Sequence, residues 1–365
     1  MSSSDRNFEG WAGVDDRATK GGMVLKQFQP KPWDDNDIEV KVLYCGICGS
    51  DVHSLSGSWG PLDPSKPNIC GHEIVGQVVQ VGTKVDTSVK VGDYVGIGAQ
   101  SDSCRQCEWC LNGEEEVCAS ITWTMNSPFQ HGNAKAAGFI SCGGFANYWR
   151  GPAQFAVKVP DGLDLGSVAP MLCGGITVYS PLEQYGAGTR AKRVGVIGIG
   201  GLGHYAVLFA KAMGAEVTAI SRGTDKMEDA KKLGADKYIA MSEGIKGHEN
   251  SVDLIICTIN PDTLDVLPYM PLLRPHGTLC LVGIVRNPLS VPCFSLISGN
   301  RRVAGSNVGS PAAIGRMLQL VVDKKIESWV QRWSFNDINK ALPAFEEGKP
   351  RFRFVMVNTE NGGKL

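Results

Sequence analysis

Four cysteines lie close together in one polar segment, at Cys104, Cys107, Cys110 and Cys118. Their spacing, C-x2-C-x2-C-x7-C, allows four thiolates to close a tetrahedron around one Zn²⁺ without ligands from elsewhere. An iron–sulfur cluster is disfavoured, because the bacterial ferredoxin run has a shorter last gap followed by proline, whereas Ala119 follows Cys118 here. Four unrelated reduced thiols are a poor explanation of this pattern, because cysteine prefers burial and the segment is rich in charged residues. Because protein ligands fill every position, we expect a structural zinc site that takes no part in catalysis.

Three further motifs place cysteine or histidine beside glycine. They are Cys45–His53 (CGICGSDVH), Cys70–Glu73 (CGHE) and Met171–Gly175 (MLCGG). Two thiolates and an imidazole are a known ligand set for a catalytic zinc that keeps its fourth position open. Such an ion acts as a Lewis acid toward a carbonyl oxygen. Taken singly, each motif is weak, because a lone His72 is more often a hydrogen-bonded core histidine and a lone Cys173 more often a small core hydrophobe. The interpretation depends on the motifs occurring together with a dinucleotide fold.

A glycine-rich segment, Gly198-Ile199-Gly200-Gly201-Leu202-Gly203, directly follows the apolar run Arg193–Ile197 and precedes a helical pattern. This is the G-x-G-x-x-G order in the strand–turn–helix context that makes it informative. The glycines allow a tight turn, and the free N–H groups of the following helix favour a pyrophosphate. We therefore expect a dinucleotide here rather than an ordinary glycine-rich turn.

The end of the next expected strand distinguishes between the two nicotinamide dinucleotides. Enzymes that use NAD usually place Asp or Glu there to hold the ribose. Here Ser221 and Arg222 follow Ile220, and Lys226 comes four residues after Arg222. A hydroxyl and two cations suit a 2′-phosphate, so NADP(H) is predicted over NAD(H). Asp225 is interpreted as a helix-start residue rather than a ribose ligand.

The elements that must position these residues differ between two parts of the chain. From Glu39 to about Val159, short Val- and Ile-rich segments alternate with glycine turns, which predicts a β-rich barrel or sandwich. From Val194 onward, strands alternate with helical stretches, which predicts a doubly wound parallel sheet. The expected strands are Arg193–Ile197, Val217–Ser221, Val252–Thr258 and Thr278–Ile284, and the expected helices are Gly201–Met213, Asp225–Leu233 and Ala312–Val322.

These patterns predict three segments. Residues 1–164 are expected to form the β-rich domain with both zinc sites, residues 165–310 the dinucleotide domain, and residues 311–365 a return to the first domain. The last segment is too short to fold alone, which is why we dock it on the first domain.

Length and composition exclude several functional classes. The chain has 365 residues, of which 43% are hydrophobic, and 36 basic residues balance 37 acidic ones. A net charge of -1 without a basic run argues against nucleic acid as a partner, and charged residues or glycine interrupt each apolar stretch before it could span a membrane. The polar start, Met1–Gly13, lacks the apolar region of an export signal. We expect a cytoplasmic protein, in which the 12 cysteines stay reduced.

Together these segments resemble the zinc-dependent medium-chain dehydrogenase/reductase superfamily. More narrowly, they resemble its cinnamyl alcohol dehydrogenase branch, which includes NADP-dependent alcohol dehydrogenases of fungi. The resemblance extends from about Phe8 to Val357 and is carried by CGICGSDVH, GHEIVG, the four-cysteine loop, MLCGGITVYSPL, VGVIGIGGLGH, ISRGTDK and PRFRF. It implies an α/β fold in which a GroES-like β-rich catalytic domain is joined to a Rossmann domain.

The resemblance also implies roles for individual residues. Cys48, His72 and Cys173 would hold the catalytic zinc, with Glu73 able to replace the water when no substrate is bound. Ser50 would begin a proton relay that passes through the cofactor ribose to His53. The remaining cysteines outside the four-cysteine loop are interpreted as packing thiols: Cys45, Cys70, Cys142, Cys257, Cys280 and Cys293.

Further residues are implied around the cofactor and the substrate. Thr177 would contact the nicotinamide, and Ser221, Arg222 and Lys226 the 2′-phosphate. Other residues expected to line the cofactor cleft are Gly283, Ile284, Ser306, Asn307 and Arg353. Walls of the substrate pocket are expected at Trp59, Ile121 and Phe294. The segment Asn133–Ser141 departs from the short turn usual in the family, so substrate size does not carry over. The family usually forms homodimers through edge strands of the cofactor domains.

The predicted activity is reversible, zinc-dependent hydride transfer between NADPH and aromatic or medium-chain aldehydes, with primary alcohols as substrates in reverse. General acid–base groups such as Ser50 and His53 contribute about 10²–10⁴-fold to such a reaction. One alternative is the reduction of a C=C or iminium bond, although the intact relay disfavours it. A non-enzymatic NADPH-binding protein is the alternative from another class, and the complete set of ligands for an open zinc site argues against it.

Overall fold

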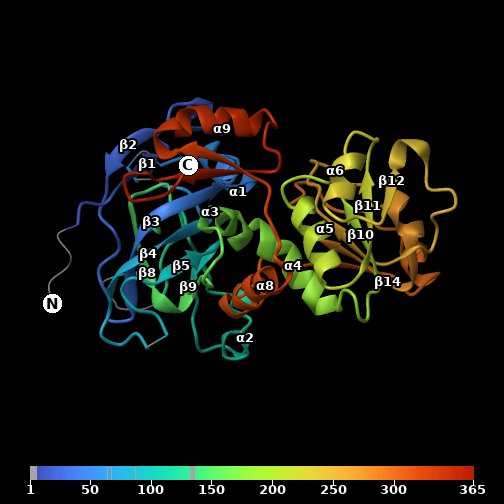
Figure 1. Ribbon diagram of the computed structural model, residues 1–365, viewed down its shortest axis with the longest axis horizontal. Coiled ribbons are helices and arrows are strands. Elements are labelled where there is room, and N and C mark those ends of the chain that lie inside the picture. The colour runs from blue at the N-terminus through green and yellow to red at the C-terminus, as the bar shows by residue number, and fades with distance from the viewer. Residues whose placement is uncertain (1–5, 64, 67, 87, 132–135) are drawn as a thin grey trace. The chain divides into compact units, whose positions relative to one another are not determined.

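Two units make up the computed structural model, which describes residues 6–63, 65–66, 68–86, 88–131 and 136–365 (Figure 1). Unit 1 contains the chain up to Cys173 together with Gly309–Leu365. Unit 2 contains Gly174–Val308. The chain therefore leaves unit 1 once and returns to it once.

The first boundary between the units lies nine residues beyond the expected one, at Cys173 instead of residue 164. The reason is that α3 (Leu165–Val168) and η4 (Ala169–Leu172) pack against strands of unit 1. Their apolar side chains Val168, Met171 and Leu172 are at most 1% exposed. The second boundary, after Val308, lies two residues before the expected one at 310.

A sheet of seven strands forms the centre of unit 1. Its order is β16-β17-β3-β4-β5-β9, and β8 also pairs with β3; every pair is antiparallel except β16 with β17. The longest strand, β3, pairs with three neighbours, one of which, β17, comes from the returning C-terminal segment. The strands are β3 (Asp37–Ile47), β4 (Ile74–Val81), β5 (Tyr94–Ile97), β8 (Tyr148–Pro152), β9 (Ala156–Lys158), β16 (Val330–Ser334) and β17 (Arg353–Val357).

Smaller elements of unit 1 surround this sheet. Its α-helices, besides α3, are α1 (Gly49–Leu55), α2 (Glu108–Leu111), α8 (Pro311–Lys324) and α9 (Ile338–Glu346). Its further 3-10 turns are η1 (Ala18–Lys20), η2 (Glu115–Val117), η3 (Ala153–Phe155) and η7 (Phe335–Asp337), and two small hairpin sheets pair β1 (Glu9–Ala12) with β2 (Val24–Gln27) and β6 (Gln100–Asp102) with β7 (Thr122–Trp123).

Helix α8 covers the expected helix Ala312–Val322 and extends slightly beyond it at both ends. The Ser310 side chain accepts a hydrogen bond from the Ala313 N–H, and Pro311 occupies the first turn. Lys325, in the left-handed conformation, ends the helix. Ser310 and Pro311 are ordinary helix-start signals, and a left-handed residue is a common way for a helix to end.

The core of unit 1 is apolar, but β3 also buries two carboxylates. Val40, Val42 and Ile47 of the same strand are fully buried. Glu39 pairs with Arg150, and Asp37 pairs with Lys31. Because each buried carboxylate meets a cation, these pairs avoid the large penalty of an isolated buried charge.

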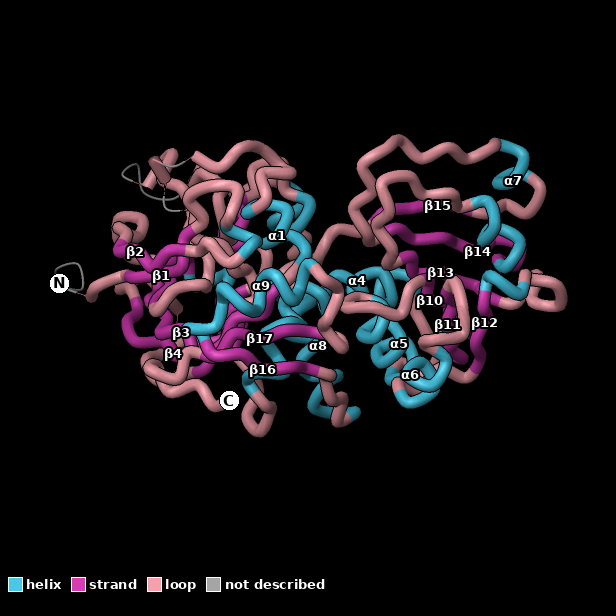
Figure 2. Tube along the Cα trace, turned by 90° about the horizontal axis from the view of Figure 1, so that it is seen from above, coloured by secondary structure: helices cyan, strands magenta, loops and turns pink. Residues whose placement is uncertain are grey.

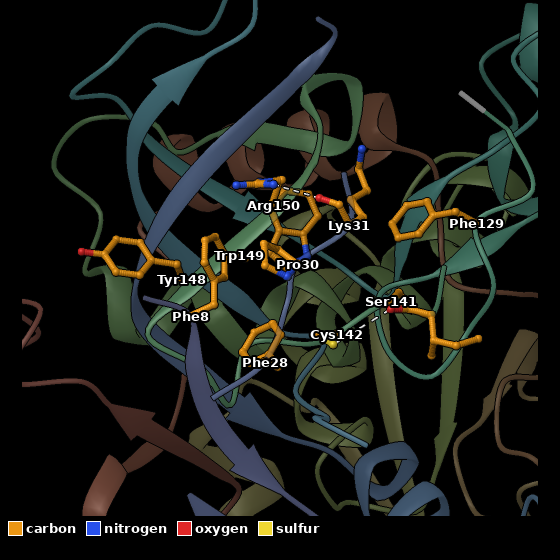
Figure 3. A pocket seen from close by; sticks show the side chains of 11 residues that line it. Phe8, Phe28, Pro30, Lys31, Phe129, Ser141, Cys142, Tyr148, Trp149 and Arg150 are labelled. Atoms are coloured by element: carbon orange, nitrogen blue, oxygen red, sulfur yellow. Dashed lines mark hydrogen bonds between the residues drawn. The ribbon is translucent and has the colours of Figure 1, made fainter. Parts of the chain in front are cut away.

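A small cavity opens among aromatic side chains of unit 1, including Phe8, Phe28 and Tyr148 (Figure 3). Its volume is about 20 Å³, enough for a water molecule or two. Of its lining residues, Ile140 and Ser141 belong to the segment Asn133–Ser141, and none is a predicted metal, relay or cofactor residue. A space of this size is a packing feature rather than a substrate pocket.

Unit 2 is built on a six-stranded parallel sheet in the order β12-β11-β10-β13-β14-β15 (Figure 2). From β10 the chain adds β11 and then β12 toward one edge of the sheet. It then adds β13, β14 and β15 toward the other edge, so the strand order reverses between β10 and β13. This is the doubly wound order in which ligands bind at the carboxyl edge, beside the reversal. The strands are β10 (Arg193–Ile197), β11 (Glu216–Ser221), β12 (Lys237–Ala240), β13 (Val252–Cys257), β14 (Leu273–Leu281) and β15 (Arg302–Gly305).

Helices and short turns connect these strands. They are α4 (Gly174–Tyr185), α5 (Gly203–Ala212), α6 (Met227–Lys232), η5 (Met241–Glu243), η6 (Leu267–Leu272) and α7 (Cys293–Ile297). Helix α5 packs on β10 and β11, and α6 lies beside β12 (Figures 1 and 2). The expected strands and helices of this unit are present, but β14 begins five residues before the expected Thr278, and β12 and β15 were not expected.

Within the described residues, no single helix has the length and apolar composition to span a membrane. The bent pair Leu165–Leu172 and Gly174–Tyr185 passes the same test only when its two helices are counted together.

Candidate active site and metal centres

The first ligand candidate, Cys48, lies where β3 gives way to α1. It is the residue that caps α1, and its backbone N–H donates to Asp51 Oδ2 at 2.8 Å. An acidic side chain at this third helical position reaches back to the cap, as in a capping box. The motif CGICGSD therefore fixes the backbone that carries the Cys48 sulfur.

The same carboxylate also holds His72. Asp51 Oδ1 accepts from the Gly71 N–H at 2.8 Å and from His72 Nδ1 at 2.9 Å. Because Nδ1 carries the donated proton, Nε2 keeps its lone pair, and it lies 3.2 Å from Cys173 Sγ. Asp51 is fully buried and His72 is 2% exposed. A carboxylate behind a histidine is the usual arrangement around a metal, since it fixes the ring and its tautomer.

The distances among these side chains fit one metal ion. Cys48 Sγ and Cys173 Sγ are 3.9 Å apart, and two thiolates at a Zn–S distance of about 2.3 Å in a tetrahedron are separated by roughly 3.8 Å. One ligand atom from each of Cys48, His72, Glu73 and Cys173 lies within 4.8 Å of all the others. The structure thus brings the three predicted ligands together, although Cys173 is 125 residues from Cys48.

The two sulfurs affect each other's protonation. Their contact lowers the pKa of Cys48 well below its ordinary value and raises the pKa of Cys173, because one thiolate disfavours a second one beside it. A dipositive ion between the sulfurs would relieve this repulsion and allow both to be thiolates. The donor set therefore fits Zn²⁺.

Glu73 adds a buried carboxylate to this cluster. Its Oε1 pairs with Arg353 Nη2, whereas Oε2 has no hydrogen-bond partner among the described residues. Burial raises the pKa of Glu73 to about 8. A Cβ on Gly46 would come within 1.9 Å of Oε2 and 3.1 Å of the Glu73 Cβ, so a larger residue at position 46 would displace Glu73. A buried oxygen without a partner beside two thiols and an imidazole is a further sign that a cation belongs here.

Arg353 differs from the sequence-based expectation. It was expected to line the cofactor cleft, but its side chain is 3% exposed and pairs with Glu73 inside unit 1. Its strand, β17, pairs with the end of β3, and Phe354 lies opposite Ile47. This register brings the guanidinium to Glu73. A contact between Arg353 and the cofactor stays a prediction.

Both residues of the predicted proton relay lie on α1, three positions apart and partly exposed. Ser50 Oγ is 4.0 Å from Cys48 Sγ. The His53 ring lies 5.6 Å from the Trp59 ring, measured between centroids. Residues three apart share one face of a helix, so α1 carries both groups on the face that begins at Cys48.

The four-cysteine loop forms a second, separate cluster in unit 1. Cys110 Sγ lies 3.8 Å from Cys104 Sγ and 3.5 Å from Cys107 Sγ, and the ligand atoms of all four cysteines, including Cys118, lie within 4.8 Å of one another. These separations again match a tetrahedron of thiolates around Zn²⁺. Such distances are far too long for disulfide bonds.

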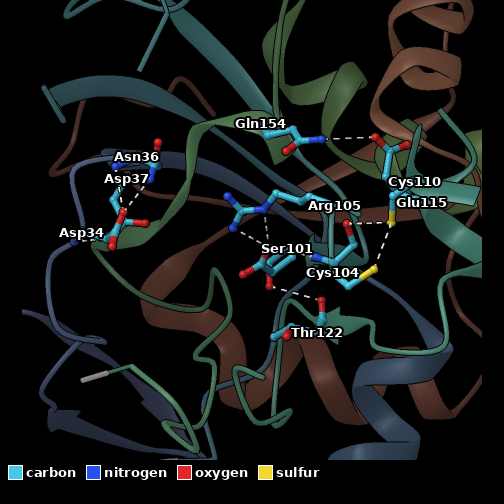
Figure 4. A network of polar contacts seen from close by, with 12 residues as sticks. Asp34, Asn36, Asp37, Ser101, Cys104, Arg105, Cys110, Glu115, Thr122 and Gln154 are labelled. Atoms are coloured by element: carbon cyan, nitrogen blue, oxygen red, sulfur yellow. Dashed lines mark hydrogen bonds and ion pairs between the residues drawn. The ribbon is translucent and has the colours of Figure 1, made fainter. Parts of the chain in front are cut away.

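Backbone N–H groups and a partly buried ion pair support this loop, whose residues Cys104, Arg105 and Cys110 are shown in Figure 4. Hydrogen bonds from the Gln106 and Cys107 backbone lower the pKa of Cys104 to about 6, which favours the thiolate. Burial raises the pKa of Cys110 to about 12. Arg105 donates to the buried Asp102 at 2.7 Å. The loop is therefore anchored to the β6–β7 hairpin sheet at one end.

In unit 2, the glycine segment joins β10 to α5. Gly198 has a φ of +85°, and a Cβ on Gly203 would come within 1.7 Å of the Gly198 carbonyl. A Cβ on Gly200, by contrast, would meet no atom within 4 Å. Two of the glycines are thus required by the turn and by the helix behind it, and Gly200 leaves room for a ligand. Gly201 and Leu202 complete the turn, half-buried.

Apart from Thr177 on α4 and Lys226 at the start of α6, the other predicted cofactor residues of unit 2 lie at the carboxyl ends of its strands. Ile197 of β10 pairs with Ile220 of β11, so the glycine turn and Ser221–Arg222 share one edge. Gly283 and Ile284 follow β14, and Ser306 and Asn307 follow β15. Thr177 is 8% exposed on α4, and Arg222 is exposed.

The predicted pocket walls have different exposures. Trp59 is 53% exposed and Ile121 is half-buried in unit 1, whereas Phe294 is 77% exposed on α7 of unit 2. Of the segment Asn133–Ser141, residues 133–135 lie outside the described residues. These substrate contacts stay predictions.

Comparison with known proteins identifies the family. Residues 34–161 match the alcohol dehydrogenase GroES-like domain, and residues 201–323 match the zinc-binding dehydrogenase domain. The chain is 39% identical to "Probable cinnamyl alcohol dehydrogenase 3" of Oryza sativa, covering 88% of this chain and 86% of that protein. The chain belongs to the zinc-dependent medium-chain dehydrogenases. Its similarity to "NADP-dependent alcohol dehydrogenase 6" of Saccharomyces cerevisiae is close to this, at 38% identity over 91% of each chain.

Solved structures of medium-chain dehydrogenases give the same result. A cinnamyl alcohol dehydrogenase of Sorghum bicolor matches with a TM-score of 0.88 and 37% identity, covering 98% of this chain and 99% of that one. The CAD of Helicobacter pylori, complexed with NADP(H), matches with a TM-score of 0.85 and 32% identity over 96% and 98% of the two chains. The resemblance to the cinnamyl alcohol dehydrogenase branch and the predicted two-part α/β fold are confirmed.

Two residues that matter to this dehydrogenase site were not recognised in the sequence. Asp51 was given no role in the sequence-based prediction, yet it holds both Cys48 and His72. Gly46 was likewise given no individual role, yet it makes room for Glu73. The one available signal was an acidic residue at the third position of α1, where it can reach the helix cap.

Replacing Asp51 with asparagine is expected to weaken zinc binding by about 10–100-fold. Asp51 accepts hydrogen bonds at both of its oxygens. The asparagine side chain has only one oxygen, so in either orientation its NH₂ group would face an N–H donor and lose a hydrogen bond. Zinc retained after dialysis against increasing chelator measures the effect. Asp161→Asn, an exposed change in the same unit, is the control. Equal zinc retention in Asp51→Asn and the wild type would contradict the role of Asp51.

Cys110→Ser is expected to remove the second zinc and to lower the thermal midpoint by about 5–10 °C, because structural zinc contributes folding free energy. Activity at 25 °C should stay within about twofold, since four protein ligands leave no position for substrate. Zinc content and thermal unfolding measure both effects, with Cys142→Ser as the thiol control outside either cluster. A variant with normal zinc content and an unchanged midpoint would contradict the structural role.

Proposed function

We propose that this chain is a zinc-dependent, NADP(H)-dependent alcohol dehydrogenase that reduces aromatic or medium-chain aldehydes and oxidises the corresponding primary alcohols. The observation that carries the proposal is the cluster of Cys48, His72 and Cys173, whose separations suit Zn²⁺ and whose three protein ligands leave a fourth position open. The names of the relatives support the substrate class and the cofactor.

When bound, zinc supplies Lewis acidity toward the aldehyde oxygen, and NADPH supplies the hydride. The residues of the chain hold these groups and move protons. Cys48, His72 and Cys173 would hold the metal, and Asp51 accepts from His72 Nδ1, which leaves Nε2 as the ring nitrogen for the metal. Glu73 Oε2 lies ready as a further oxygen ligand.

Proton transfer is assigned to Ser50 and His53. Ser50 is the hydroxyl beside Cys48, and His53 is partly exposed one helical turn later. Histidine is the side chain that most often transfers protons in catalysis. We therefore propose that Ser50 passes a proton to the alcohol oxygen and that His53 is the group that connects the relay to solvent.

At the cofactor, Gly198–Gly203 is assigned to the pyrophosphate, and Ser221, Arg222 and Lys226 to the 2′-phosphate. The α5 N-terminus with its open glycine supports the first assignment. The exposed Arg222 at the end of β11 supports the second, because no carboxylate takes its place there.

A homodimer is the proposed assembly. Strand β15 is the last strand on its side of the unit 2 sheet, and Ile284, Phe294 and Ile297 are each more than 60% exposed. An unpaired edge strand beside exposed apolar side chains is a surface that natural proteins usually cover. Twelve free cysteines support a reducing compartment, and we propose the cytoplasm.

The test combines metal analysis with substrate assays on the purified protein. We expect two zinc ions per chain. With cinnamaldehyde or hexanal as substrate, we expect a far higher kcat/KM for NADPH than for NADH. Sedimentation should give twice the monomer mass. A zinc-loaded protein that turns over none of the aldehydes would favour the non-enzymatic alternative.

A further inference from the structure

The turn that follows β11 is held in place by the neighbouring strand β12 and by η5, which follows β12. Ser242 N–H donates to the Arg222 carbonyl at 2.8 Å, and the Tyr238 hydroxyl donates to the Gly223 carbonyl at 2.7 Å. Tyr238 belongs to β12, which lies beside β11 in parallel register, with Tyr238 opposite Ala219 (Figure 1). Both donors therefore come from the segment adjacent to the turn.

A third carbonyl of the same turn is held from the other side. The Met227 N–H, in the first turn of α6, donates to the Thr224 carbonyl at 2.9 Å. Three consecutive carbonyls, from Arg222 to Thr224, are therefore engaged. Because each peptide group is planar, fixing a carbonyl also fixes the direction of the next N–H. The direction in which the Arg222 side chain leaves the turn is thus set by its hydrogen bonds.

Gly223 shows that the outer side of this turn is open. A Cβ on Gly223 would meet no atom within 4 Å, and its φ is not in the left-handed region. Neither packing nor backbone conformation therefore requires a glycine at this position. A glycine that the fold does not need suits a place where a ligand comes close to the backbone.

We propose that Tyr238 is a positioning residue for the 2′-phosphate of NADP(H), and thereby a determinant of the preference for NADP(H) over NAD(H). Its hydroxyl holds the Gly223 carbonyl, which keeps the Arg222 side chain and the adjacent N–H groups directed toward the phosphate. Tyr238 itself does not touch the cofactor. The inference rests on the proposed function, since it assumes that this turn binds the phosphorylated ribose.

Tyr238→Phe tests this role because it removes only the hydroxyl. Calorimetric binding of adenosine 2′,5′-bisphosphate and of 5′-AMP separates the 2′-phosphate from the rest of the nucleotide without requiring turnover. We expect the bisphosphate to bind about three- to tenfold more weakly, as for the loss of one hydrogen bond, and 5′-AMP to bind within twofold of the wild type. The thermal midpoint should change by less than about 2 °C.

Tyr269→Phe is the matched control. Tyr269 lies in η6 of the same unit, before β14 and therefore at the amino edge of the sheet, and should leave both affinities unchanged. Unchanged bisphosphate binding in Tyr238→Phe, or an equal loss for both nucleotides, would overturn the positioning role while the cofactor assignment stands. A wild-type protein that binds 5′-AMP as tightly as the bisphosphate would instead overturn the cofactor assignment itself.

Discussion

Replacing Cys48 with serine is expected to lower kcat/KM for aldehyde reduction by about 10³-fold or more. A serine hydroxyl is a weaker and harder ligand than a thiolate, and it stays protonated at neutral pH. Because Cys48 Sγ is one of the two sulfurs 3.9 Å apart in the cluster, its loss leaves two protein ligands and Glu73. Zinc should fall from two ions per chain to one.

The control for Cys48→Ser is Cys293→Ser, an exposed thiol of unit 2. It makes the same chemical change and should alter neither zinc content nor rate. NADPH binding, followed by fluorescence, should be retained in both variants, since the glycine turn belongs to the other unit. Full activity of Cys48→Ser with one zinc per chain would show that the chemistry lies elsewhere.

How much of each site could be predicted from the sequence depends on whether its residues lie close together along the chain. The four-cysteine loop and the glycine turn are contiguous, so their residue types and spacing contained the whole prediction. The catalytic cluster was different, because His72 and Cys173 are 101 residues apart. Their meeting depends on η4 packing against β3 and β4, which no local pattern encodes. Only the family resemblance chose Cys48 over its neighbour Cys45.

Arg353 illustrates a second limit. Its partner Glu73 is 280 residues away in the sequence, and the contact arises from the register of β17 on β3. The motif PRFRF identified Arg353 as part of the family pattern, but it could not predict in which direction the Arg353 side chain points. The pairing of a buried cation with a buried carboxylate can be predicted only once the two segments that carry them are placed.

Short strands were missed in unit 2 for a physical reason. β12 reads KYIA and β15 reads RVAG, so each offers only a few apolar residues beside a charge or a glycine. β14 begins with LRPHG, in which proline and glycine indicate a turn rather than a strand. Pairing with established neighbours overrides these local preferences. Because β12 was missed, the role of Tyr238 was also invisible.

Arg222→Asp is expected to lower kcat/KM with NADPH by about 100-fold while leaving that with NADH unchanged or higher. The substitution removes a charge-assisted hydrogen bond, worth about 1.5–3 kcal/mol, and adds repulsion against the 2′-phosphate. The exposure of Arg222 weakens this repulsion through solvent screening. NADH carries a ribose hydroxyl in place of the phosphate. A carboxylate at the end of this strand can accept a hydrogen bond from that hydroxyl.

Lys192→Asp is the matched control for this cofactor switch. It reverses an exposed positive charge directly before β10, at the amino edge of the same sheet, and so changes net charge equally without approaching the carboxyl edge. If long-range attraction of the anionic cofactor were the cause, both variants would lose NADPH affinity alike, and both losses would vanish at high salt. A local contact predicts that only Arg222→Asp changes the ratio of the two cofactors. An equal loss for NADPH and NADH in Arg222→Asp would remove the assignment of the 2′-phosphate to the turn after β11.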